Sequence, residues 1–145
     1  MSSASADTRA PRAPFAARLA LGLIALTAAL IGIPASFAPE SFYERFPFFA
    51  EWVSLLPPYN EHLVTDVGGL YLGFAVVFAW GALTLSRELV LAACAGWAVA
   101  ALAHLVFHIT NLAPFGAADA IAQTAGLALA LGLPALAVWA VGPRR

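Results

Sequence analysis

The side chains able to do chemistry come in pairs that lie four residues apart. Three such pairs occur along the chain: His62 with Asp66, His104 with His108, and Asp119 with Gln123. Residues at this spacing share one face of a helix. Facing helices of a bundle are a common frame for metal ligands. Three histidines with one or two carboxylates suit zinc, iron or copper better than calcium or magnesium.

The pairs therefore predict a metal site within a wider polar cluster. The predicted ligands are His62, Asp66, His104 and His108, and the cluster also holds Glu61, Asp119 and Gln123. A histidine pair across two helices would also suit haem. Two other interpretations stay open: His104 hydrogen-bonds Asp66 or Gln123 and holds the helices together, or the cluster forms a substrate or quinone pocket. His-x-x-x-His without an internal glutamate lacks the base of a metalloprotease, and we assign no catalytic residue.

The composition excludes several classes of protein. The 145 residues are 62% hydrophobic and only 10% charged, whereas soluble domains are about a quarter charged, so a soluble globule is excluded. Seven arginines, no lysine and a net charge of −1 exclude nucleic-acid binding through a basic surface. The single Cys94 excludes an intramolecular disulfide, and we interpret it as packing material.

Four apolar stretches must position the polar pairs. A membrane-spanning helix needs about 20 apolar residues to cross about 30 Å of hydrocarbon. The predicted spans cover residues 17–37, 63–85, 89–109 and 121–141. We therefore predict an all-α integral membrane protein whose residues 15–145 form a four-helix transmembrane bundle. Residues 1–14 are rich in Ser, Ala, Pro and Arg and predict a flexible cytoplasmic tail.

The segment between the first two spans is too patterned to be a simple connection. Large apolar side chains recur at steps of three or four residues: Phe42, Phe46, Phe49, Val53 and Leu56. This pattern predicts an amphipathic outer loop that lies on the membrane surface or caps the bundle. A lid over a pocket is the alternative. Pro39 is expected to begin one short helix and Pro47 a second. Asn60 is placed to cap the second span.

The arginines predict the orientation of the chain. Six of them fall on one side of a four-span arrangement: Arg9, Arg12, Arg18, Arg87, Arg144 and Arg145. Only Arg45 falls on the other side. The positive-inside rule then places both termini in the cytoplasm. All three histidines would lie near the opposite, extracytoplasmic end.

Small residues predict how the helices pack. Gly69 and Gly73 are four residues apart on the second span, and Gly126 lies on the fourth. Small residues at this spacing allow close approach of membrane helices. We expect these glycines to pack against Ala100 and Ala101 on the third span. The polar pairs would then converge. At least three of their side chains aimed at one point would favour a metal site, whereas one isolated His–Asp pair would favour structural hydrogen bonding.

Residues 59–73 read Tyr-Asn-Glu-His-Leu-Val-Thr-Asp-Val-Gly-Gly-Leu-Tyr-Leu-Gly. This segment resembles the second span of small four-helix bacterial membrane proteins of the DoxX-like or DUF4345-like type. His104-Leu-Val-Phe-His108 is similar to the polar end of the third helix in these proteins. The resemblance implies the four-span architecture and a location in a bacterial inner (cytoplasmic) membrane. Some members of this group are linked to membrane redox and thiol stress.

Three functions fit these observations. The first is a small non-enzymatic accessory or interaction subunit, because the chain is short and carries no recognised catalytic motif. The second is a redox protein with a transition metal or haem at the His/Asp cluster. The third is a small-molecule transporter that acts as a dimer. The expected partners are the lipid bilayer and either another membrane protein or a second copy of the chain.

Overall fold

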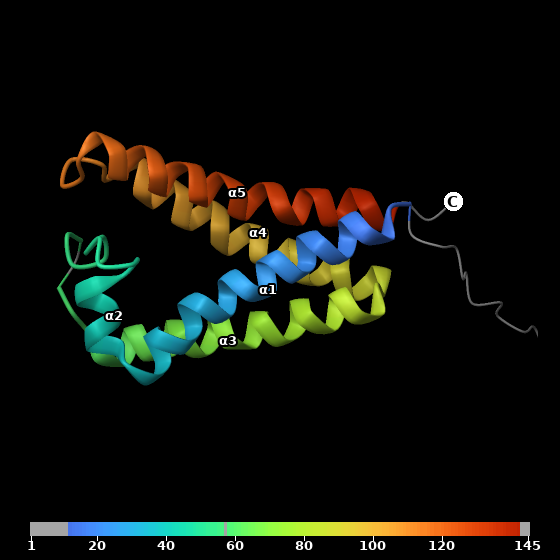
Figure 1. Cartoon of the computed structure of the whole chain (residues 1–145), viewed down its shortest axis with the longest axis horizontal. Helices are drawn as coiled ribbons and strands as arrows, with labels where there is room; N and C mark the ends of the chain where they lie inside the picture. Colours follow the sequence, from blue (N-terminus) through green and yellow to red (C-terminus); the bar gives the residue numbers. More distant parts are fainter. Residues whose placement is uncertain (1–11, 57, 143–145) are drawn as a thin grey trace, which may run out of the picture.

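The fold is a bundle of α-helices. The computed structural model describes residues 12–56 and 58–142, and these contain five helices and no strand. The helices are α1 (Pro14–Phe37), α2 (Pro39–Arg45), α3 (Glu61–Thr84), α4 (Arg87–Thr110) and α5 (Ala117–Val141) (Figure 1). All but α2 are long and apolar enough to cross a membrane. The four long apolar helices expected from the sequence are confirmed, and each begins two to four residues earlier than expected.

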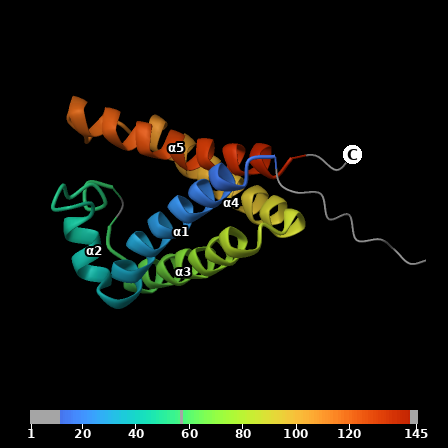
Figure 2. The same cartoon turned by 45° about the vertical axis from the view of Figure 1, so that its right-hand side comes forward.

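The long helices form two antiparallel pairs. α1 lies along α3, and α4 lies along α5 (Figures 1 and 2). The start of α1 and the end of α5 lie at one end of the bundle, here called the termini end, and α2 lies at the other, the α2 end (Figure 1). At the termini end α1 also packs on α5. Towards the α2 end the two pairs diverge, and α3 makes little direct contact with α4 (Figure 2).

The α1–α3 pair is held at a distance that only glycine permits. A Cβ atom added at Gly32 would lie 2.9 Å from the carbonyl oxygen of Gly68, and one added at Gly68 would lie 2.6 Å from the backbone nitrogen of Ser36. Such distances are too short for any real Cβ, so the two backbones are in direct contact. This is the close approach typical of small residues in membrane helices.

The glycines predicted to pack the helices lie elsewhere. A Cβ added at Gly69, Gly73 or Gly126 would meet no atom within 4 Å, and all three residues are exposed. The predicted packing through these three glycines is therefore wrong, whereas Ala101 on α4 is buried in the core. Successive residues of an α-helix are turned by about 100°, so burying Gly68 turns Gly69 away from α1.

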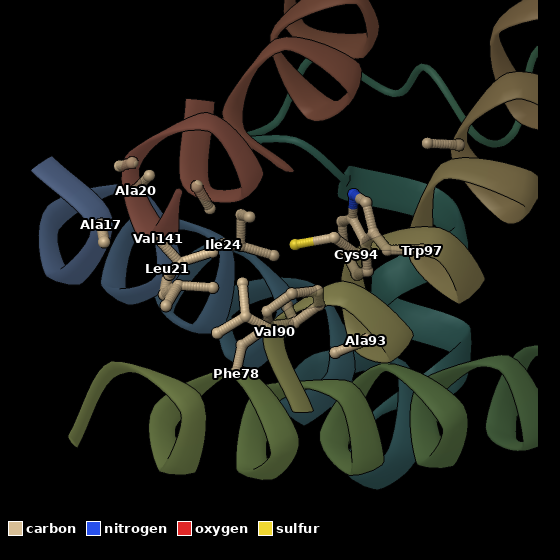
Figure 3. Packing of buried hydrophobic residues seen from close by; sticks show 14 residues of the cluster. Ala17, Ala20, Leu21, Ile24, Phe78, Val90, Ala93, Cys94, Trp97 and Val141 are labelled. Carbon is tan, nitrogen blue, oxygen red and sulfur yellow. The ribbon is translucent and has the colours of Figure 1, made fainter. Parts of the chain in front are cut away.

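The core joins the two helix pairs at the level of Trp97 (Figure 3). Leu21 and Ile24 from α1 pack with Phe78, Val90 and Cys94. Cys94 is buried and lies among apolar side chains, which agrees with its interpretation as packing material. The buried cluster also includes alanines of α1 and α5 that let the helices pack closely: Ala17, Ala20, Ala28, Ala137 and Ala140.

The connection between α1 and α3 is only partly helical. Pro39 occupies the first turn of α2, as expected. The second helix predicted to start at Pro47 does not form, so this expectation is wrong. Phe46 is extended, with φ −81° and ψ 143°, because a residue before proline is pushed out of the helical region. Phe48 and Phe49 then adopt positive φ angles and are exposed.

Residues 12 and 13, which precede α1, pack against α5. Most of the tail predicted at residues 1–14 lies outside the described residues, which begin at residue 12. The backbone nitrogen of Ala13 donates a hydrogen bond to the carbonyl oxygen of Ala140 at 3.0 Å. The Arg12 guanidinium lies 6.0 Å from the centre of the Trp139 ring. These contacts fix the start of α1 against α5.

Candidate functional site

A polar cluster lies between α4 and α5 near the α2 end. His108 Nδ1 lies 2.6 Å from Gln123 Oε1, and Gln123 is only 4% exposed. The ring of His104 lies one turn away on α4, with its centre 4.7 Å from that of His108. The structure therefore pairs His108, and not His104, with Gln123. We call His104, His108 and Gln123 the α4–α5 site.

The segment after α2 reaches across to this part of α5. Trp52 Nε1 donates a hydrogen bond to Asp119 Oδ1 at 3.0 Å. Asp119 lies one helical turn before Gln123, so this bond lies beside the α4–α5 site. The amphipathic pattern of this segment did not predict the role of Trp52. The contact joins two segments 67 residues apart, and nothing in the local spacing indicates it.

The polar pair on α3 stands apart from this site. His62 Nε2 lies 3.2 Å from Asp66 Oδ2, and their side chains are 88% and 59% exposed. Within residues 12–56 and 58–142, no group of three or more His, Cys, Asp or Glu side chains is placed to hold a metal ion. The expected convergence of His62, Asp66, His104, His108 and Asp119 on one point is therefore wrong.

His62 and Asp66 do not join the α4–α5 site because of the way α3 is rotated about its own axis. Close packing through Gly68 and Gly32 buries one face of α3 against α1. His62 and Asp66 lie on the same side of α3 as Gly69 and Gly73, and this side is exposed. The divergence of the two helix pairs then separates the α3 side chains from those of α4 and α5.

Glu61 belongs to a third polar region. It lines an open depression of about 350 Å³ at the α2 end, together with Ala38, Pro39, Glu40, Ser41 and Tyr59. Partial desolvation raises the pKa of the Tyr59 phenol, and the negative charges of Glu61 and Glu40 raise it further. Asn60 caps α3 here, as predicted, by accepting a hydrogen bond from the backbone nitrogen of Leu63 at 3.1 Å.

We expect Asp119→Ala to release the segment that carries Trp52. The hydrogen bond from Trp52 to the Asp119 carboxylate links this segment to α5, and bonds to charged groups are worth about 1.5–3 kcal/mol. Chymotrypsin should therefore cleave at the exposed Phe48 and Phe49 about tenfold faster. Asp119→Asn is the control, because its side-chain oxygen still accepts the bond. Equal cleavage of the wild type and the Asp119→Ala variant would disprove the role of this contact.

The fold and the site together define a class of protein. The chain is all-helical in its described part, has four helices able to cross a membrane, and gathers polar side chains at the α2 end. Comparisons with known proteins find no match, whether among family models, curated proteins or solved structures. The relationship to DoxX-like proteins therefore stays a prediction from the sequence.

Proposed function

We propose that the chain is a multi-pass protein of the bacterial inner membrane that works as a non-enzymatic accessory or interaction subunit. The observation that carries the proposal is the exposed face of α3. This face combines two glycines with two ionisable side chains, where a helix surrounded by lipid would ordinarily show large apolar residues. We further propose that it associates with the same face of a second copy.

The α3 face has the properties of a helix–helix contact. Gly69 and Gly73 have open space where a side chain would stand, so the backbone of another helix can approach closely. His62 and Asp66 lie on the same face, and ionisable groups in spans usually pair or face protein. In a parallel symmetric pair each residue meets its counterpart at the same depth, so glycines face glycines and polar groups face polar groups.

The arginines support an orientation with both termini in the cytoplasm. Arg18 Nη1 donates to the carbonyl oxygen of Ala82 at 3.1 Å, and Arg87 Nε donates to that of Gly142 at 2.9 Å. Both bonds lie at the termini end. Arg45 belongs to α2 at the opposite end. Under the positive-inside rule the termini end faces the cytoplasm.

Cysteine crosslinking in native membranes tests the proposed association. We expect Gly73→Cys, in a Cys94→Ala background, to form a disulfide-linked product of twice the chain mass on oxidation. Leu129→Cys is the matched control, since Leu129 is exposed near the middle of α5 and should not crosslink. Equal dimer yields at both positions, or none at residue 73, would overturn the association. If the cysteine at residue 73 crosslinks only to a different protein, the association between two copies is also overturned, and that protein is the partner instead.

A further inference from the structure

We propose that His104 and His108 together bind one late transition-metal dication, with Gln123 as a positioning residue. The proposal concerns the α4–α5 site alone and does not depend on the association through α3. It uses two of the four ligands expected from the sequence and leaves out His62 and Asp66, which lie on another face.

The contact with Gln123 orients His108 for metal binding. The Gln123 side-chain oxygen can only accept, so His108 Nδ1 carries the hydrogen and donates it across 2.6 Å. A neutral imidazole protonated at Nδ1 has its lone pair on Nε2. Metal-binding histidines commonly donate their other ring N–H to a carbonyl or carboxylate in this way, which fixes the tautomer and the ring orientation.

The burial of Gln123 supports this role. Its side-chain nitrogen Nε2 is buried and has no hydrogen-bond partner among the described residues. A buried donor without a partner costs about 1–3 kcal/mol. A small apolar side chain would avoid that cost, so packing alone does not explain a glutamine here. What the side chain does provide is the short contact with His108.

His104 supplies the second nitrogen. It lies one turn before His108, with the ring centres 4.7 Å apart, and its ring nitrogens make no hydrogen bond with any described residue. Two histidines four apart on one helix also provide the paired zinc ligands of helical metalloprotease motifs. Imidazole ligands favour Zn²⁺, Cu²⁺ or Ni²⁺ over Ca²⁺ or Mg²⁺. Two protein nitrogens leave further coordination positions at the metal open for other ligands.

Calorimetric titration of the full chain in mild detergent with Zn²⁺ tests the site. We expect one ion per chain, with no comparable binding of Mg²⁺. His104→Gln and His108→Gln keep a polar side chain and should each weaken zinc binding at least tenfold. His62→Gln is the matched control, and its affinity should equal that of the wild type. No binding of one equivalent, or loss of binding only in the His62→Gln variant, would overturn the proposal.

Variants of Gln123 separate positioning from folding. Gln123→Leu should weaken zinc binding by about 10–100-fold, the usual effect of removing such a supporting hydrogen bond. Gln123→Glu, in contrast to Gln123→Leu, should bind zinc as tightly as the wild type or more tightly, because a carboxylate accepts the His108 N–H more strongly. Thermal unfolding without zinc checks that each variant is folded. Unchanged zinc affinity in a folded Gln123→Leu variant would disprove the positioning role.

Discussion

Replacing Gly68 with alanine is expected to separate α1 from α3 and destabilise the protein by about 1–3 kcal/mol or more. The new Cβ would lie 2.6 Å from the backbone nitrogen of Ser36 and 2.8 Å from the carbonyl carbon of Ala35. Backbone atoms of a helix cannot move aside separately, so α1 as a whole must shift. Unfolding in a titration of mixed detergent micelles with SDS, followed by circular dichroism, measures the loss.

The neighbouring Gly69 provides the control for this prediction. An alanine there meets no atom within 4 Å, and alanine in a helix is favoured over glycine by about 0.5–1 kcal/mol. At a chain concentration low enough to keep the protein monomeric, so that the proposed α3 association does not contribute, Gly69→Ala should therefore unfold at the same or a slightly higher SDS fraction than the wild type. Equal destabilisation by the two substitutions would show that α3 packs on α1 through a different face.

Local signals predicted the elements of this fold well. The length of the apolar stretches identified the four long helices, because spanning a bilayer requires about 20 such residues. Asn60 and Pro39 marked the starts of α3 and α2, since an Asn side chain caps a helix and proline suits its first turn. Each of these signals depends only on residues close together in the chain.

The rotation of α3 could not be predicted in the same way. Gly68 and Gly69 are adjacent, and either could belong to a close helix contact. Which of these two glycines packs on α1 depends on α1 itself, where the small residues Ala28 and Gly32 lie four apart on the face towards α3. That small-residue signal was present in the sequence, but only its combination with Gly68 identifies the packed face. The expected polar convergence was wrong because it followed from the other choice.

The α4–α5 site was predicted in part. The spacing of His104 and His108, and that of Asp119 and Gln123, placed each pair correctly on one helix face. The sequence did not indicate which histidine meets Gln123, because this depends on how far α4 and α5 slide past each other. Trp52 reaches Asp119 from a segment of irregular backbone, whose path a helical repeat cannot describe.

The two helix pairs depend on Trp97 for their connection. Its ring lies edge-on to Tyr71, Phe74 and Phe78 of α3, with centres 5.3–5.7 Å apart. On its other side, Nε1 donates a hydrogen bond to the carbonyl oxygen of Ala130 in α5 at 2.8 Å. Large aromatic side chains thus fill the space between α3 and α4, whose backbones make little contact.

We expect Trp97→Ala to cost about 3 kcal/mol, the lower end of the range for such changes in soluble cores. The lower end applies because lipid is as apolar as the core, so the loss comes from packing. Trp97→Phe keeps an aromatic ring and loses the bond to Ala130, which should cost about 1 kcal/mol. SDS unfolding measures both losses of stability. Zinc binding by the Trp97→Ala variant, under conditions in which it stays folded, shows whether α4 and α5 still form the α4–α5 site. A Trp97→Ala protein as stable as the wild type would show that other contacts hold the two pairs together.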